Sequence, residues 1–331
     1  MIRDVLIVGA GPSGLAAAIA ATQRGLEYAL IEKGALVNSI FNFPPQMVFF
    51  TTPELLEIGG LPLVTPYDKP TRLEALRYYR RVVDTYGLRI AFNERVTAIE
   101  REVDGTFVVT TAGSRGSARV WQARAVVLAI GYYDIPHLLG VPGEDLPHVS
   151  HYYTESHPYY RKRVVIVGGK NSAAEAALDL YRAGAHVTLV HRHAALGESI
   201  KYWVKPDIEN RLKEGSIASR LESRVVEITP AGVTVEGPGG CELLPAEQVF
   251  LLTGYRADVE LMRRAGVRCD VETLVPEYAP ETFETNVPNL FVAGGAIAGQ
   301  YTGTVFIENG RFHGEKIIAV LAERLEAAGR D

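Results

Sequence analysis

The chain has 331 residues, of which 47% are hydrophobic, so its length predicts about two domains and its composition allows each to bury a core. The net charge of -5 gives no electrostatic footprint for nucleic acid or an anionic membrane, which favours a small-molecule or small-protein partner. No export signal precedes the first apolar run, and no run approaches the roughly 18 residues of a membrane span, so we expect a cytoplasmic protein without a membrane partner.

The first predicted elements are a strand at residues 4–8, a glycine-rich turn at 9–14 and an Ala-rich helix that ends at Gly25. A second strand at 28–31 leads into Glu32, which lies 23 residues after the first glycine of the turn. A strand, a GxGxxG turn, a helix and an acidic residue at this spacing form the fingerprint of a dinucleotide-binding unit.

The three glycines of this turn have separate roles. Gly9 permits the tight turn, Gly11 lets the backbone approach a pyrophosphate, and Gly14 allows the helix and strand to pack closely. The N–H groups at the start of the helix would bind the phosphates. Glu32 would accept hydrogen bonds from ribose hydroxyls; the alternative is that it is a solvated residue at a strand end.

An irregular aromatic segment at residues 38–65 and a helix at 71–86 come next. The helix is predicted from a capping box of Thr71 with Glu74 and from the glycine that follows it. Four further strands are predicted, at residues 96–102, 107–111, 118–121 and 125–130. The first three form a meander, and the last runs into Gly131.

The same plan recurs in the second half of the chain. A strand at residues 163–167, a glycine-rich turn at 168–173, an Ala-rich helix at 174–182 and a strand at 187–190 follow in the same order. A helix at 205–213 and strands at 224–229, 233–236 and 249–253 complete this half, which ends at Gly254. An internal repeat of this kind predicts two nucleotide-binding units.

The second turn departs from the first because Lys170 occupies the position of the middle glycine. His191 lies 23 residues after Gly168, the offset of the acidic residue in the first unit, so a neutral or cationic donor replaces the carboxylate. His191 and Arg192 could bind a 2′-phosphate that an acid would repel, which favours NADPH over NADH. The alternative is that the two residues form an exposed strand end.

Other side chains near the turns have two interpretations. Lysines could add phosphate contacts or be only solvated, namely Lys170, Lys201 and Lys205. Tyrosines around the second turn, such as Tyr132, could stack on a flavin or nicotinamide, or belong to the packing. The two cysteines, Cys241 and Cys269, form neither a CxxC dithiol nor part of a metal cluster, so we expect ordinary small residues there and no metal site.

The tail returns to the first unit, with a strand at residues 287–295 that ends in Gly294 and Gly295 and a closing helix at 306–327. Backbone groups of the two glycines and of the helix start would stabilise charge on a reduced flavin. Two dinucleotide sites in one chain imply a flavin paired with a nicotinamide, here FAD and NADPH.

The predicted fold class is therefore α/β, with two Rossmann-like three-layer (β/β/α) domains. The FAD-binding domain comprises residues 1–133 and 255–331, and the NADPH-binding domain, residues 134–254, is inserted into it.

Five segments carry a resemblance to a known family: NSIFNFP at 38–44, FTTPELL at 50–56, GGKNSA at 168–173, KYWVKPD at 201–207 and FIEN at 306–309. They look like the YpdA-type bacillithiol disulfide reductases, and the nested layout is similar to that of low-molecular-weight thioredoxin reductases over essentially the whole chain. The resemblance implies FAD in the first unit, NADPH in the second, a low-molecular-weight disulfide such as bacillithiol disulfide as substrate, and a homodimer.

Three positions depart from these families. The nicotinamide unit lacks the CxxC of thioredoxin reductases, which excludes the ordinary dithiol relay to thioredoxin. YpdA-type enzymes have a cysteine in the first turn where this chain has Ser13, whose hydroxyl cannot form a mixed disulfide. Ser13 is also an ordinary residue of FAD fingerprints. Gly295 stands where many relatives place an aspartate on the ribityl chain of the flavin.

The expected cofactor-binding residues are Gly9, Gly11, Pro12, Ser13, Gly14, Glu32, Lys33, Val96, Ala129, Gly131, Gly168, Gly169, Lys170, Asn171, Ser172, His191, Arg192, Gly254, Gly294, Gly295 and Ile307. The catalytic residue stays unknown, with Ser13 at the position of the family cysteine. Two other functions stay open beside disulfide reduction. One is an NADPH-dependent ferredoxin or flavodoxin reductase, which needs no cysteine, and the other is a flavin-binding redox sensor with low turnover.

Overall fold

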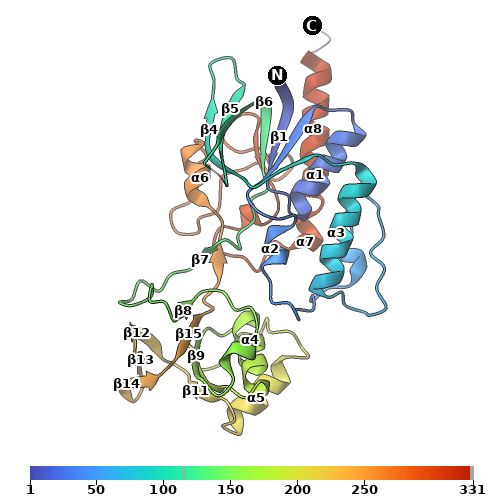
Figure 1. Cartoon of the computed structure of the whole chain (residues 1–331). Helices are drawn as coiled ribbons and strands as arrows, with labels where there is room; N and C mark the ends of the chain where they lie inside the picture. The colour runs from blue at the N-terminus through green and yellow to red at the C-terminus, as the bar shows by residue number, and fades with distance from the viewer. Residues whose placement is uncertain (115, 329–331) are drawn as a thin grey trace. The chain divides into compact units, whose positions relative to one another are not determined.

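The structure, a computed structural model, describes residues 1–114 and 116–328 and divides into two compact units (Figure 1). Unit 1 comprises Met1–Asn42, Gln46–Ile135 and the described part of Tyr255–Asp331; unit 2 comprises Phe43–Pro45 and Pro136–Gly254. Unit 2 is therefore inserted between two parts of unit 1. The last three residues of the predicted third segment, 329–331, lie outside the described residues.

The strands of the main sheet of unit 1 are β1 (Ile2–Val8), β2 (Tyr28–Glu32), β3 (Ile90–Phe92), β4 (Glu94–Arg101), β5 (Phe107–Gly113), β6 (Ala118–Leu128) and β17 (Leu290–Val292). Their order is β3-β2-β1-β6-β5-β4, with β17 also paired to β6. β1 is parallel to β2 and β6, whereas β4, β5 and β6 form the predicted antiparallel meander. β6 is one strand where the sequence predicted two, because Gln122 and Ala123 continue the pairing with β1.

The helical segments of unit 1 are α1 (Pro12–Gln23), α2 (Asn38–Phe41), η1 (Pro53–Leu55), α3 (Arg72–Tyr86), α6 (Val259–Arg264), η3 (Gly294–Ala298), α7 (Ile307–Gly310) and α8 (His313–Ala328). The capping box of Thr71 and Glu74 at the start of α3 is confirmed. α1 and α8 pack side by side (Figure 1), so closely that a Cβ on Gly314 would overlap the backbone of Ala17.

The helix predicted at residues 306–327 is instead two helices, α7 and α8, separated by Arg311 and Phe312. The Nη1 group of Arg311 donates to the carbonyls of Glu54 and Glu57 at 2.6 and 2.8 Å. These tertiary hydrogen bonds hold the chain where the break occurs, and the sequence period of the helix does not reveal them.

Unit 2 repeats the plan on a smaller scale. Its main sheet has the order β11-β10-β9-β15-β8, in which all pairs are parallel. The elements of unit 2 are β8 (Val149–Ser150), η2 (His157–Tyr159), β9 (Arg163–Val167), α4 (Asn171–Arg182), β10 (His186–Val190), α5 (Lys205–Lys213), β11 (Ala218–Arg220), β12 (Arg224–Thr229), β13 (Gly232–Gly237), β14 (Gly240–Pro245) and β15 (Gln248–Leu251). β12, β13 and β14 form a separate antiparallel sheet. The short strands β7 (Ile135–Pro136) and β16 (Tyr255–Arg256) mark where the chain leaves and re-enters unit 1.

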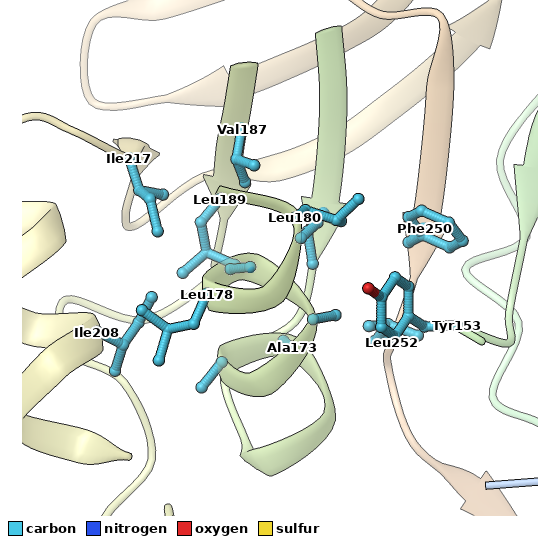
Figure 2. Close-up of a cluster of buried hydrophobic side chains, with 14 of the residues drawn as sticks. Tyr153, Ala173, Leu178, Leu180, Val187, Leu189, Ile208, Ile217, Phe250 and Leu252 are labelled. Atoms are coloured by element: carbon cyan, nitrogen blue, oxygen red, sulfur yellow. The ribbon is translucent and has the colours of Figure 1, made fainter. Parts of the chain in front are cut away.

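One core cluster of unit 2 lies between its main sheet and α4 (Figure 2), and a second joins the main sheet to β12, β13 and β14. Leu180 of α4 and Leu189 of β10 are fully buried, and Ile208 of α5 closes the cluster from the other side. The ring of Phe250 meets that of Tyr153 edge to face at 5.3 Å. Burial of each aliphatic side chain contributes about 1.5–3 kcal/mol, so this cluster fixes α4 and the turn before it on the sheet. Over the described residues, no helix is long and apolar enough to cross a membrane.

Candidate cofactor sites

The glycine-rich turn of unit 1 is shaped by close backbone contacts. The Gly9 amide donates to the Ile31 carbonyl at 2.8 Å, and the φ of Gly9 is 105°. A Cβ on Gly9 or on Gly14 would overlap backbone atoms of Ala129 or of Gly9 itself, so these two positions admit no side chain. A Cβ on Gly11, by contrast, would meet nothing within 4 Å. The backbone at Gly11 is therefore open to the approach of a ligand.

The start of α1 provides an anion site beside Gly11. Pro12 is the first residue of α1, and within the described residues no side chain caps this end and no acid lies in the first turn. The first N–H groups of a helix have no intrahelical partner, and the helix dipole favours negative charge there. The site fits the pyrophosphate of a dinucleotide.

Glu32 is buried and tied to the turn, which excludes the alternative of a solvated strand end. Its carboxylate accepts from the backbone amides of Ala10 and Gly34, both at 2.9 Å. Burial raises the pKa of Glu32, while these two hydrogen bonds favour its charged form. Each oxygen keeps lone pairs beyond the one bond it accepts, so the carboxylate can still receive a ribose hydroxyl.

Four other expected residues of unit 1 have different settings. Lys33 forms an ion pair with Asp134 at 2.5 Å. Val96 is buried at an irregularity in the β4–β5 pairing. Ala129 follows β6 and donates to the Val8 carbonyl at 2.8 Å, and Gly131 has a φ of 64°. Lys33 and Val96 thus have roles in the fold whether or not a cofactor contacts them.

The tail meets the first turn at Gly294. A Cβ on Gly294 would overlap the hydroxyl of Ser13, and its φ is 60°. The Gly294 amide donates to Nδ1 of His313 at 3.1 Å, in a buried hydrogen bond. The Gly294 amide is thus already used by a side chain of the protein, and the expected contact of Gly294 with the flavin stays a prediction. Sequence reasoning missed His313, since a lone histidine at a helix start carries no pattern.

Gly295 has a structural reason for its departure from the family aspartate. A Cβ at this position would lie 2.6 Å from Cδ1 of Tyr132, so the tyrosine ring takes the space that an aspartate would need. Burial and the nearby Glu308 raise the pKa of Tyr132, and its phenol stays protonated. Ile307, another expected residue, is the first residue of the short helix α7.

The turn of unit 2 reproduces the hydrogen bonding of the first. The Gly168 amide donates to the Val190 carbonyl at 3.0 Å, as Gly9 does to Ile31, and a Cβ on Gly168 would lie 2.6 Å from the Leu252 carbonyl. The ring of His191 lies so close to Gly169 that a Cβ there would overlap it. His191 therefore covers the second residue of its turn, as Glu32 binds the second residue of the first turn.

The electrostatics at the end of β10 favour a neutral His191 beside an exposed cation. Partial burial, together with the charges of His193 and Arg192, lowers the pKa of His191. Arg192 is exposed and donates through Nε to Nε2 of His193 at 3.2 Å. The start of α4 follows Lys170, with no acid in its first turn and no side-chain cap among the described residues. This end of unit 2 also fits a dinucleotide phosphate.

Asn171 and Lys201 are used by the protein itself. Nδ2 of Asn171 donates to the Ser199 carbonyl at 2.9 Å, and its Oδ1 accepts from the Lys201 amide at 2.8 Å. Lys201 is 5% exposed, and its ammonium group pairs with the carboxylate of Glu175 at 2.5 Å. Lys201 is therefore not the solvated lysine of our alternative interpretation, and its charge already has a carboxylate partner in this structure. The Asn171 side chain secures the segment that follows His191.

The remaining expected residues have clear positions. Ser172 is exposed in the first turn of α4, and Gly254 ends unit 2 with a φ of 99°. Lys205 pairs with Glu198 at 2.5 Å. Cys241 is exposed on β14 of unit 2, whereas Cys269 belongs to unit 1, where burial raises the pKa of its thiol.

Comparisons with known proteins agree with this geometry. Residues 6–294 match the family described as pyridine nucleotide-disulphide oxidoreductase. The bacilliredoxin reductase Bdr of Bacillus subtilis (strain 168) is 42% identical over 327 residues, which cover 98% of this chain and 99% of that protein. The solved bacillithiol disulfide reductase Bdr (YpdA) from Bacillus cereus is 41% identical, covers 98% of this chain and 100% of its own, and superposes with a TM-score of 0.95. A ferredoxin–NADP reductase of Ignicoccus hospitalis is 27% identical over 88% of this chain and 90% of its own.

These matches confirm the predicted α/β class and the predicted cofactor pair of a flavin and a nicotinamide. The chain is a flavoprotein oxidoreductase that uses FAD and NAD(P)H. It belongs to the pyridine nucleotide-disulphide oxidoreductase family, in the group of the YpdA-type bacillithiol disulfide reductases.

Proposed function

We propose that the chain is an NADPH-dependent flavoprotein that reduces a low-molecular-weight disulfide of the bacillithiol disulfide type. The observation that carries this proposal is the pair of matched turns, one in each unit, which are followed by a buried carboxylate at Glu32 and by the His191–Arg192 pair. The substrate class is supported by the similarity to two reductases, one named for bacilliredoxin and one for bacillithiol disulfide.

Unit 1 would hold FAD. Gly11 and the first turn of α1 would receive the pyrophosphate, and the carboxylate of Glu32 would accept from the ribose. The ring of Tyr132 over Gly295 replaces an acidic contact with an apolar one. When bound, FAD accepts a hydride and passes the electrons to the acceptor.

Unit 2 would hold NADPH. The first turn of α4 would bind the pyrophosphate, with Lys170 and Ser172 exposed beside it. Arg192 would donate to the 2′-phosphate, and His191, neutral in the unliganded site, would gain a proton from the same contact. The two hydrogen bonds that the Asn171 side chain forms with the backbone of Ser199 and Lys201 would order the segment next to this phosphate.

The net reaction consumes one NADPH, one proton and one disulfide, and it yields NADP⁺ and two thiols. The hydroxyl of Ser13 lies against Gly294 and within 3.2 Å of a Cβ built on Gly310. A hydroxyl forms no disulfide, so Ser13 contributes to the packing of the turn, and no sulfur of this turn shares in the electron transfer.

The proposal is tested by stopped-flow reduction of the flavin-loaded protein with NADPH or NADH, followed by reoxidation with bacillithiol disulfide, a ferredoxin or oxygen. We expect faster reduction by NADPH and reoxidation by the disulfide with two thiols formed per NADPH. Reoxidation by ferredoxin alone would refute disulfide reduction, and a protein that binds no flavin would refute the whole assignment.

Ferredoxin reduction is the second candidate because it needs no thiol and the chain matches a ferredoxin–NADP reductase at 27% identity. One-electron reduction of the ferredoxin, without turnover of any disulfide, would identify it. Slow reoxidation by every acceptor would instead identify a flavin-binding redox sensor.

The resemblance to the YpdA-type reductases also supports a cytoplasmic homodimer as part of the proposal. Light scattering on the purified flavoprotein should give twice the chain mass of 36.1 kDa, and fractionation of expressing cells should recover the activity with the cytoplasm. A mass of one chain would refute the dimer.

A further inference from the structure

His313 holds a buried position where several helix ends of unit 1 meet. It is the first residue of α8 and is 9% exposed. Its Nδ1 atom accepts from the Gly294 amide at 3.1 Å, and its ring stacks on Phe283 with centroids 4.1 Å apart and planes at 22°. The in-plane hydrogen bond and the stacking contact fix both the position and the tilt of the imidazole.

The turn at Gly294 has little space to move away from His313. A Cβ on Gly294 would overlap Ser13 at the start of α1, and a Cβ on Gly310 would lie 3.1 Å from the Cα atom of Gly294. Gly314, next to His313, is pressed against Ala17 of α1 in the same way. The Gly294 turn is therefore enclosed by α1, the end of α7 and the start of α8, and the Gly294 amide donates to Nδ1 of His313.

The hydrogen bond requires a neutral imidazole. Nδ1 accepts only when it carries no proton, so the proton lies on Nε2. Burial and the nearby Lys316 lower the pKa of His313 to about 4. Glu284, next to Phe283, has its carboxylate bound by Arg324 at 2.7 and 2.8 Å, and the described first turn of α1 carries no acid. Burial of the ring and the positive charge of Lys316 thus oppose its protonation.

We propose that His313 is a positioning residue for the flavin site: by accepting the Gly294 amide it fixes the turn that carries Gly295 and the start of η3 beside Ser13. This inference rests on the proposed binding of FAD in unit 1. His313 needs no contact with the cofactor, because it acts through the backbone of Gly294. The residue is predicted to set how tightly FAD binds and at what potential it is reduced.

The test compares His313→Leu, which removes the acceptor at similar volume, with His313→Asn, whose Oδ1 can replace Nδ1. Leaving one buried amide without a partner should weaken FAD binding about tenfold and shift the flavin midpoint potential and visible spectrum. His313→Asn should restore most of both. FAD release by the wild type should rise as the pH falls towards 4, since a protonated Nδ1 would face the Gly294 donor, and His313→Asn should lack this transition.

The inference would be overturned by unchanged FAD affinity and potential in His313→Leu, or by a similar loss in the Leu and Asn variants. A misfolded Leu variant is recognised by circular dichroism, and the Asn variant and the pH profile then decide. If the wild type binds no FAD, the proposed function fails while the hydrogen bond stays testable. The stability of the cofactor-free protein should then fall as the pH drops from about 6.5 to about 4, and His313→Asn should lack this transition. Persistence of the transition in His313→Asn would refute the role of His313.

Discussion

Gly294→Ala should destabilise unit 1 for two separable reasons. The φ of 60° costs an L-residue about 1–2 kcal/mol, and the overlap of the new Cβ with Ser13 adds about 1–3 kcal/mol. Ser13→Gly removes the overlapping atoms and leaves the backbone strain unchanged. In a Ser13→Gly background, Gly294→Ala should therefore cost only the first 1–2 kcal/mol.

The assay is the free energy of unfolding from urea denaturation of the wild type, the two single variants and the double variant. Gly60→Ala is the matched control, because Gly60 has a φ of 79° but a Cβ there would meet nothing within 4 Å. Its cost should be about 1–2 kcal/mol and should not change with Ser13→Gly. If the Gly294 and Ser13 effects are additive within about 0.5 kcal/mol, Ser13 does not pack against Gly294.

Three further predictions concern the cofactor sites. Gly295→Asp should lower stability by about 1–3 kcal/mol, because its Cβ would lie 2.6 Å from the Tyr132 ring, and Tyr132→Ala should recover most of this loss in thermal unfolding; no recovery would contradict the contact. Arg192→Ala should raise the KM for NADPH about tenfold and leave the KM for NADH unchanged. The control Arg224→Ala, also at an exposed arginine, should leave both KM values unchanged. Equal effects of Arg192→Ala on the two cofactors would exclude a phosphate contact. The lowered pKa of His191 leaves its ring neutral at pH 7, and phosphate binding favours the charged ring, so the KM for NADPH should fall as the pH is lowered from about 8 to about 6.5. His191→Asn should flatten this profile, and an unchanged profile would assign the protonation elsewhere.

The features that sequence could predict are those that depend on neighbours along the chain. The turn at Gly9 follows from a strand, glycine spacing and a helix start, and the capping box at Thr71 is complete within four residues. The repeat of these local signals in the second half also predicted the inserted unit. Even there, the chain-level pattern missed that β6 is continuous and that the last helix breaks at Arg311, because both depend on partners from distant segments.

The features that sequence could not predict are those in which a residue is used by a distant partner. Lys201 has the positive charge that phosphate binding requires, but Glu175, 26 residues earlier, pairs with its ammonium group in the interior. The Gly294 amide had the position of a flavin contact, but His313 accepts from it 19 residues later. In each case the polar group is satisfied by the fold itself, and only the tertiary structure shows which groups remain for a ligand.

The two units share one backbone arrangement but differ in the residue at the end of the second strand: unit 1 has the acidic Glu32, and unit 2 has His191 followed by Arg192. In each, the second residue of the turn is tied to the residue that ends the second strand: the Ala10 amide donates to Glu32, and Gly169 lies beneath the ring of His191. The strand-end residue thus shapes the turn, and in our proposal it also selects the ligand. A carboxylate can do both for a ribose with two hydroxyls, but it would repel a 2′-phosphate. An imidazole, packed on a residue without a side chain and followed by Arg192, keeps the turn closed while it reverses the electrostatic preference. The glycine at position 169, where the first unit has alanine, is what makes room for that exchange.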